Sequence, residues 1–138
     1  MKKIILSLVM FTILGTTHIF GQAKGKESAE MASFCGKSGD ATLVYAALWK
    51  CDNITAANKE VKIKSFNMRW QLPASKGEKE GLWIESSNMG GKISAENMAK
   101  LKTLEALKVT KLLIENVIAT DADGKNERKI SGMVITLK

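Results

Sequence analysis

The stretch 60-EVKIKSFNMRWQL-72 carries the strongest strand pattern in the chain. Apolar residues alternate with polar ones, but the alternation slips by one position at Lys64-Ser65. Because a one-residue slip sends side chains to the opposite face, we expect a bulge or bend there, or a strand that passes from one sheet to another. The polar members of the alternation are Lys, Asn, Arg and Gln. They indicate that one face of this sheet meets water.

The residues on the C-terminal side continue this pattern into a hairpin and then a helix. Pro73 and the charged run 74–80 predict a solvated turn, and 81–87 predicts a second strand, so 60–87 reads as one long hairpin. After the glycine pair at 90–91, Ser94 is a typical helix N-cap, and the apolar spacing predicts a helix over 94–105.

The C-terminal third predicts a second hairpin. Residues 109–120 and 128–137 flank an Asp-Gly turn at 121–126, and Gly132 predicts a bulge or a close backbone approach. Upstream, 41–50 places apolar residues on one helical face, with Asp40 as the N-cap. We expect a short helix there, with a strand as the alternative. Two hairpins joined by a helix predict a mostly β sandwich with one or two short helices; a small α+β plait is the alternative.

The N-terminus has the features of a cleavable export signal. Two lysines precede an 11-residue apolar run, Ile4 to Leu14, which is too short to span a bilayer, and small residues offer cleavage after Gly21 or Ala23. We therefore expect a signal peptide at 1–21, a polar leader at 22–34 and one domain at 35–138. The mature protein would be periplasmic or secreted, without membrane insertion.

Export bears on the state of the two cysteines and on which catalytic or metal-binding residues the mature chain keeps. Removing 21 of the 138 residues removes the one histidine, so the mature chain has no Ser-His-Asp or Cys-His catalytic pair and no ordinary Cys/His zinc set. We expect no catalytic residues, no metal site and no cofactor. Cys35 and Cys51 are expected to form a disulfide, although two unpaired thiols or a redox pair stay open.

The candidate contact residues lie in the first hairpin. Trp70 lies in the apolar phase of its strand. Trp83 lies in the opposite phase to the apolar residues on either side of it, and is therefore the better candidate for a contact residue. Arg69, Lys62 and Lys64 occupy the polar phase and are the other candidate partner contacts. The chain has a net charge of +7, but its lysines are scattered and form no nucleic-acid motif, so we expect no nucleic-acid partner.

The same residues carry a resemblance to a known family. The run Gly36-Lys37-Ser38-Gly39, then 63-IKSFNM-68, 90-GGKIS-94, 114-IENV-117, Asp123-Gly124-Lys125 and a closing 130-ISGMVI-135 resemble the last domain of GldM. That family belongs to the gliding-motility and type IX secretion machinery of the Bacteroidetes. The likeness covers roughly residues 35–138.

The resemblance implies an immunoglobulin-like β-sandwich that acts in the periplasm by protein contact. This chain departs from the family plan because a signal peptide replaces the motor-engaging membrane helix and the preceding domains are missing. We therefore expect a free-standing copy of the distal domain, a non-enzymatic module that binds an envelope protein. A homodimer stays open, and a secreted glycan- or envelope-binding sandwich is the alternative function.

Overall fold

A computed structural model describes residues 30–138 of the chain. The expected signal peptide at 1–21, its cleavage points and residues 22–29 of the expected leader lie outside the described residues. None of the helices within 30–138 has the length and apolar character needed to cross a membrane.

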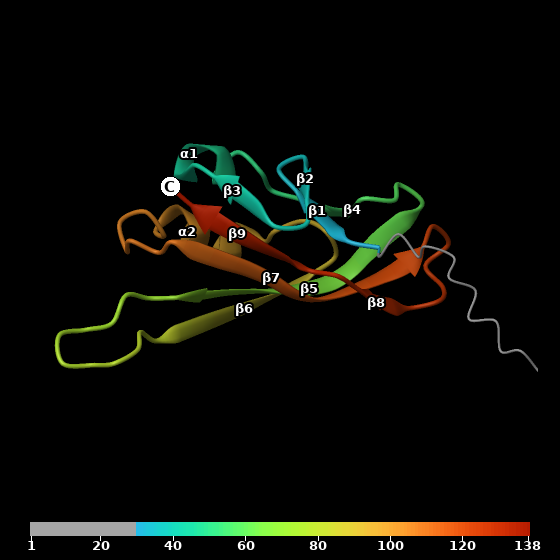
Figure 1. Cartoon of the computed structure of the whole chain (residues 1–138). Coiled ribbons are helices and arrows are strands. Elements are labelled where there is room, and N and C mark those ends of the chain that lie inside the picture. The colour runs from blue at the N-terminus through green and yellow to red at the C-terminus, as the bar shows by residue number, and fades with distance from the viewer. Residues whose placement is uncertain (1–29) are drawn as a thin grey trace, which may run out of the picture.

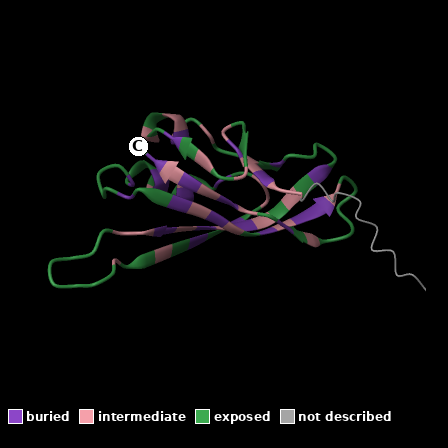
Figure 2. Ribbon diagram, in the orientation of Figure 1, coloured by how far each residue is buried: buried purple, intermediate pink, exposed green. Residues whose placement is uncertain are grey.

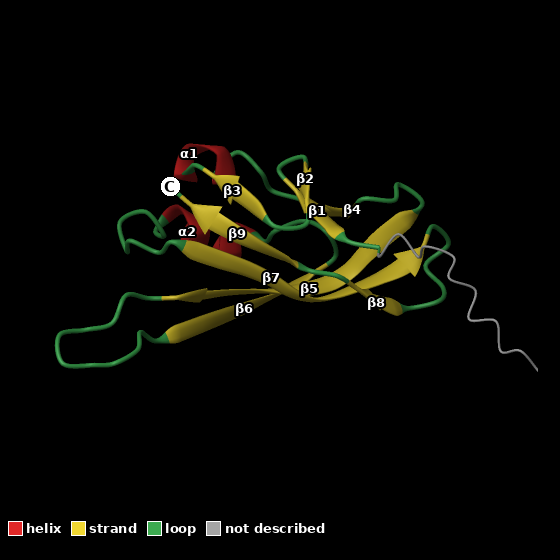
Figure 3. Cartoon of the chain, in the orientation of Figure 1, coloured by secondary structure: helices red, strands yellow, loops and turns green. Residues whose placement is uncertain are grey.

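The fold is mostly β with two short helices, as the sequence predicts (Figures 1 and 3). In chain order the elements are β1 (Ala32–Phe34), β2 (Lys37–Ser38), β3 (Ala41–Leu43), α1 (Tyr45–Leu48), β4 (Ile54–Ala56), β5 (Val61–Gln71), β6 (Trp83–Met89), α2 (Ala95–Lys102), β7 (Lys111–Asp121), β8 (Arg128–Ile130) and β9 (Met133–Leu137).

Two sheets make the layers of a sandwich. The smaller has the order β2-β1-β4, and the larger has the order β3-β9-β7-β5-β6, with β8 pairing with β7. All pairings between these strands are antiparallel except that of β3 with β9. In Figure 1 the small sheet and α1 lie above the larger sheet, and the loop between β5 and β6 extends beyond it at the left.

One apolar core lies between the layers. The larger sheet contributes the inward residues of β5, β7 and β9, and the small sheet contributes those of β1 and β4 (Figure 2). The largest fully buried side chains include Phe34, Phe66, Leu48, Ile54 and Met68. The sandwich is thus held mainly by apolar burial between its sheets, for which each large side chain contributes about 2 kcal/mol.

The long strand β5 contains the predicted irregularity. Its pairing with β7 shifts register between Ile63 and Ser65 and again between Ser65 and Asn67. Phe66, within the second shift, and Trp70, beyond it, are both buried in the core, as their alternation requires. The slip of phase in the sequence is therefore a bulge within one sheet, and the strand does not pass to the other sheet.

The expected helix over 41–50 is wrong in its first half. Ala41–Leu43 forms β3, which pairs in parallel with β9, and the helix is a single turn that begins after Val44. Val44 is the N-cap, so Asp40 does not cap the helix; its Oδ1 instead accepts a hydrogen bond from the backbone N–H of Val134 at 3.0 Å. The free edge of β9 offers residues 41–43 backbone partners, and this tertiary pairing overrides the local helical pattern.

The expected leader also ends too late. Ala32 and Phe34, which we placed in the leader, belong to β1 and are 0% and 1% exposed. Two apolar residues with one residue between them are too short a pattern to predict a strand. The folded domain therefore begins before residue 35.

The second half of the chain follows the prediction with shifted bounds. Helix α2 begins after Ser94, whose Oγ accepts from Asn97 N at 3.2 Å, but it ends at Lys102. The strand predicted over 128–137 is divided into β8 and β9 near Gly132. A Cβ on Gly132 would lie 1.9 Å from the Ile114 oxygen, so the close approach predicted there is confirmed.

Candidate partner-binding face

The two tryptophans of the first hairpin lie on opposite faces of the larger sheet. Trp70 pairs with Ile84 and is 3% exposed, whereas Trp83 pairs with Gln71 and is 40% exposed. The Arg69 guanidinium lies 4.4 Å from the centroid of the Trp83 ring, within the range of a cation–π contact. The exposure of Trp83 agrees with the sequence; its role as a contact residue stays a prediction.

Polar contacts across three strands hold this outer face in place. Arg69 on β5 lies 3.8 Å from the Glu115 carboxylate on β7, measured from Nη1 to Oε2. Asn67 Nδ2 donates to Glu85 Oε1 on β6 at 2.6 Å. Exposed ion pairs contribute at most about 1 kcal/mol, so their main effect here is to orient Arg69 and, through it, Trp83.

The two candidate lysines lie at the other end of β5. Lys62 is exposed, and Lys64 forms an ion pair with Glu127. Seven strand positions separate Lys62 from Arg69, which corresponds to roughly 23 Å. The structure therefore brings Trp83 and Arg69 together but does not add Lys62 and Lys64 to the same contact site.

Sequence reasoning missed the apolar character of the β6 edge. Strand β6 ends the larger sheet and pairs only with β5 among the described strands. Three of the five large apolar residues exposed in residues 30–138 lie on it or directly before it: Leu82 at 65%, Trp83 at 40% and Met89 at 77%. Met89 is six positions from Trp83 and so shares its strand phase, which is the signal that could have identified it.

Half of the backbone groups of β6 point away from β5. Leu72 N donates to Leu82 O at 2.9 Å, and Gly90 N donates to Lys64 O at 2.6 Å. The backbone N–H and C=O groups of the even-numbered residues from 82 to 90 therefore point toward β5. The backbone groups of the odd-numbered residues point toward the free edge. There, Asn97 Nδ2 donates to Ser87 O at 2.9 Å. Helix α2 thus occupies the edge near Ser87 and leaves the Trp83 end open.

A buried polar cluster joins α2 to the inner side of β6. Ser86, Asn88 and Asn97 are each less than 10% exposed. Ser86 Oγ is hydrogen-bonded to Asn97 Oδ1, and Asn88 Oδ1 accepts from Asn97 Nδ2 at 3.0 Å and from Ser94 N at 3.1 Å. Because buried polar groups are costly when unpaired, these bonds fix α2 against β6.

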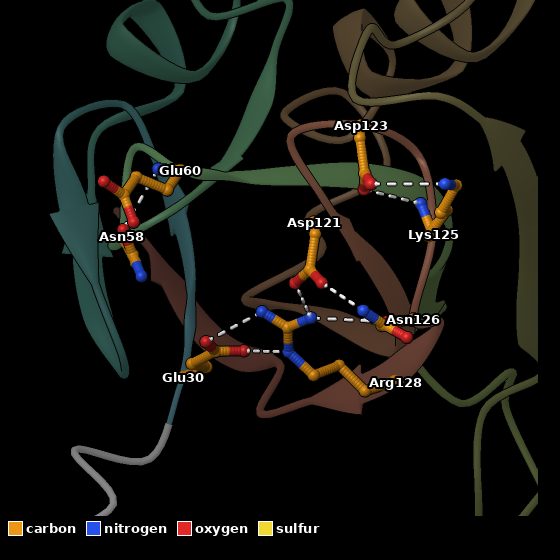
Figure 4. A network of polar contacts seen from close by, with 8 residues as sticks. All are labelled: Glu30, Asn58, Glu60, Asp121, Asp123, Lys125, Asn126 and Arg128. Atoms are coloured by element: carbon orange, nitrogen blue, oxygen red, sulfur yellow. Dashed lines mark hydrogen bonds and ion pairs between the residues drawn. The ribbon is translucent and has the colours of Figure 1, made fainter.

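A second polar network ties the start of the domain to the far hairpin (Figure 4). Arg128 binds both oxygens of Glu30, with Nε–Oε2 at 2.6 Å and Nη2–Oε1 at 3.0 Å, and its Nη1 lies 2.5 Å from Asp121 Oδ1. The hydrogen bond from Arg128 lowers the pKa of Glu30. Hydrogen bonds from Asn126 and then Arg128 lower the pKa of Asp121.

The predicted disulfide is confirmed. Cys35, directly after β1, is bonded to Cys51, three residues after α1, and their Cα atoms lie 5.4 Å apart. The bond joins the small sheet to the segment that follows α1. A structural disulfide is typical of proteins in an oxidising compartment.

The polar side chains buried within 30–138 are Ser86, Asn88, Asn97 and Thr120, which are all uncharged. The carboxyl groups whose pKa departs from its ordinary value depart downward, including Glu96 beside Lys100. No group of three or more His, Cys, Asp or Glu side chains in this part is placed to hold a metal ion.

Comparison of the chain with protein-family models and with curated proteins finds no match.

Proposed function

We propose that the protein is a non-enzymatic interaction module of the bacterial envelope, which binds a protein partner through the outer face and free edge of the β5–β6 hairpin. Its sequence resembles the distal domain of GldM, and its mostly β, two-layered fold is compatible with that resemblance. In this proposal it is a free-standing relative of that domain, associated with gliding motility or type IX secretion.

The observation that carries the proposal is the exposed apolar side chains at the two ends of β6, a strand whose outer edge is open near Trp83. Edge strands are usually protected by lysine, proline or a covering element. Residues 83–89 contain neither lysine nor proline, and within 30–138 the edge backbone receives a hydrogen bond from α2 at Ser87, away from Trp83. Leu82, Trp83 and Met89 are exposed along it, with Trp83 oriented by Arg69. Aromatic and apolar anchors next to unpaired backbone are typical of strand-addition interfaces.

The proposed location is the periplasm or the outside of the cell. It is supported by the signal-like sequence at 1–21 and by the Cys35–Cys51 disulfide. The partner in this proposal is an envelope protein. The proposal includes neither a nucleic-acid partner nor a segment inserted into the membrane.

A second candidate function is the binding of a surface or envelope glycan. A groove next to Trp83, bordered by polar side chains, favours it and is described below.

Affinity capture with paired variants tests the proposal. The tagged mature protein and the double variant Trp83→Ser/Met89→Ser are incubated with envelope extract from a gliding bacterium, and bound proteins are quantified. The control, Val44→Ser, also removes an exposed apolar side chain, which lies between β3 and α1.

We expect a secretion or motility component to be retained by the wild-type protein and by the control, and to be lost with the β6 variant. Equal retention by all three proteins would contradict the assignment of the face. Retention of no such component by the wild-type protein would contradict the proposed function.

A further inference from the structure

A groove of about 710 Å³ lies where the loop between β5 and β6 leaves the sheet. Its volume is within the range of small-molecule binding sites. One side is formed by the loop and by Trp83, and the other by the start of β7 and the turn before it. The groove is thus at the end of the outer face, away from Met89 at the opposite end of β6.

The floor and one wall of the groove are built with little freedom to move. Gln71 pairs with Trp83 across the two strands and donates from Nε2 to Gly81 O at 3.1 Å. A Cβ on Gly81 would lie 1.5 Å from Leu72 O, so the wall requires glycine at this position. Trp83 therefore has a fixed place beside a polar amide.

The charges that line the groove are mainly positive. Lys79, Lys108 and Lys111 face one acidic residue, Glu80. None of these three lysines forms an ion pair with another residue of 30–138. Unpaired cations gathered at one groove attract an anionic ligand.

Lys108 has an unusual backbone conformation at the rim. Its φ is +55°, a left-handed conformation that costs a residue with a side chain about 1 kcal/mol or more. The turn is held by hydrogen bonds from Lys108 N to Glu105 O at 2.9 Å and from Val109 N to Leu104 O at 3.0 Å. Glycine is the residue that such a turn ordinarily takes. The backbone conformation therefore does not explain why this position carries a lysine and its charge.

We propose that this groove binds an acidic saccharide, a chain of sugar rings that carries carboxylate or phosphate groups. The exposed part of the Trp83 indole would contact the apolar face of a ring, Gln71 would bond a hydroxyl, and Lys108 and Lys111 would bind the acidic group.

A saccharide fits the groove better than an acidic peptide. The groove sets an exposed indole beside the Gln71 amide, and a sugar ring offers an apolar face to the indole and a hydroxyl to the amide, whereas an acidic side chain offers no apolar ring face. This inference rests on the second candidate function, glycan binding; it shares Trp83 with the proposed protein-binding face, but the lysines that would hold the acidic group belong to the groove alone.

Titration calorimetry of the disulfide-bonded protein with three probes tests the inference. The probes are a hexamer of galacturonic acid, a neutral glucose hexamer of the same length, and a hexaglutamate peptide. The groove variant is Lys108→Asn/Lys111→Gln, in which asparagine tolerates the left-handed backbone. The control, Lys37→Gln/Lys62→Gln, removes the same charge from exposed positions away from the groove.

We expect the acidic hexamer to bind, the neutral hexamer and the peptide to bind about tenfold more weakly or not at all, and the groove variant to lose about tenfold in affinity while the control keeps it. Trp83→Ala should weaken binding to a similar extent. Three results would overturn the inference: no binding of the acidic hexamer, equal loss in the groove variant and the control, or binding of the peptide as tight as that of the saccharide.

Discussion

Phe34→Ala tests whether the segment before residue 35 belongs to the folded core. Phe34 is 1% exposed in the middle of the apolar cluster between the two sheets. Losing a buried phenylalanine side chain removes its transfer free energy and leaves a cavity, which together cost about 3 to 5 kcal/mol. The neighbouring Cys35 is held by the disulfide, so β1 has little freedom to move into the cavity. We therefore expect the upper half of that range, about 4 kcal/mol.

The measurement is guanidinium unfolding of the oxidised protein, followed by tryptophan fluorescence. Lys37→Ala is the matched control, because Lys37 lies opposite Phe34 in the β1–β2 pair but is exposed. The control should change the free energy of unfolding by no more than about 0.5 kcal/mol. A loss of less than about 1 kcal/mol for Phe34→Ala would refute the assignment of β1 to the core.

Three further predictions concern other features of the fold. Cys35→Ser/Cys51→Ser should lower the free energy of unfolding by about 3 kcal/mol, measured by denaturant midpoint at constant m-value. Ser94→Ala should lower it by about 1 kcal/mol, because Asn97 N loses its cap acceptor, as thermal unfolding would detect. Arg128 lowers the pKa of Glu30, so the contribution of this pair to stability is present above about pH 4 and is lost as pH falls through the folded-state pKa. Arg128→Met should therefore flatten the fall in stability below about pH 4, and an unchanged slope would count against this network.

The strongly patterned parts of the chain could be predicted from sequence. The long alternation in 60–72 predicts β5, its slip predicts the bulge, and the Asp-Gly turn predicts the second hairpin. Gly132 was expected to permit a close approach, and Ile114 O is the group it approaches. These features depend on local periodicity and turn chemistry, which a sequence displays directly.

The elements that the sequence analysis missed depend on tertiary partners. Ala41–Leu43 becomes a strand because β9 offers a parallel edge, and no local pattern encodes that pairing. The sequence identified Trp83 by its phase, but the contact with Arg69 depends on the register of β5 against β6. Met89 was missed because the predicted strand ends at residue 87, two positions before it, whereas β6 continues to Met89 in the same phase as Trp83.

Site-specific photocrosslinking in living cells tests the binding face most directly. A photoreactive amino acid is placed at Met89 on the outer face of β6 or at Lys59 as the control, both exposed in the fold. The account predicts that Met89 yields a crosslinked envelope protein, that Lys59 does not, and that the product is lost on Trp83→Ser. Equal crosslinking from both positions, or none from Met89, would contradict it.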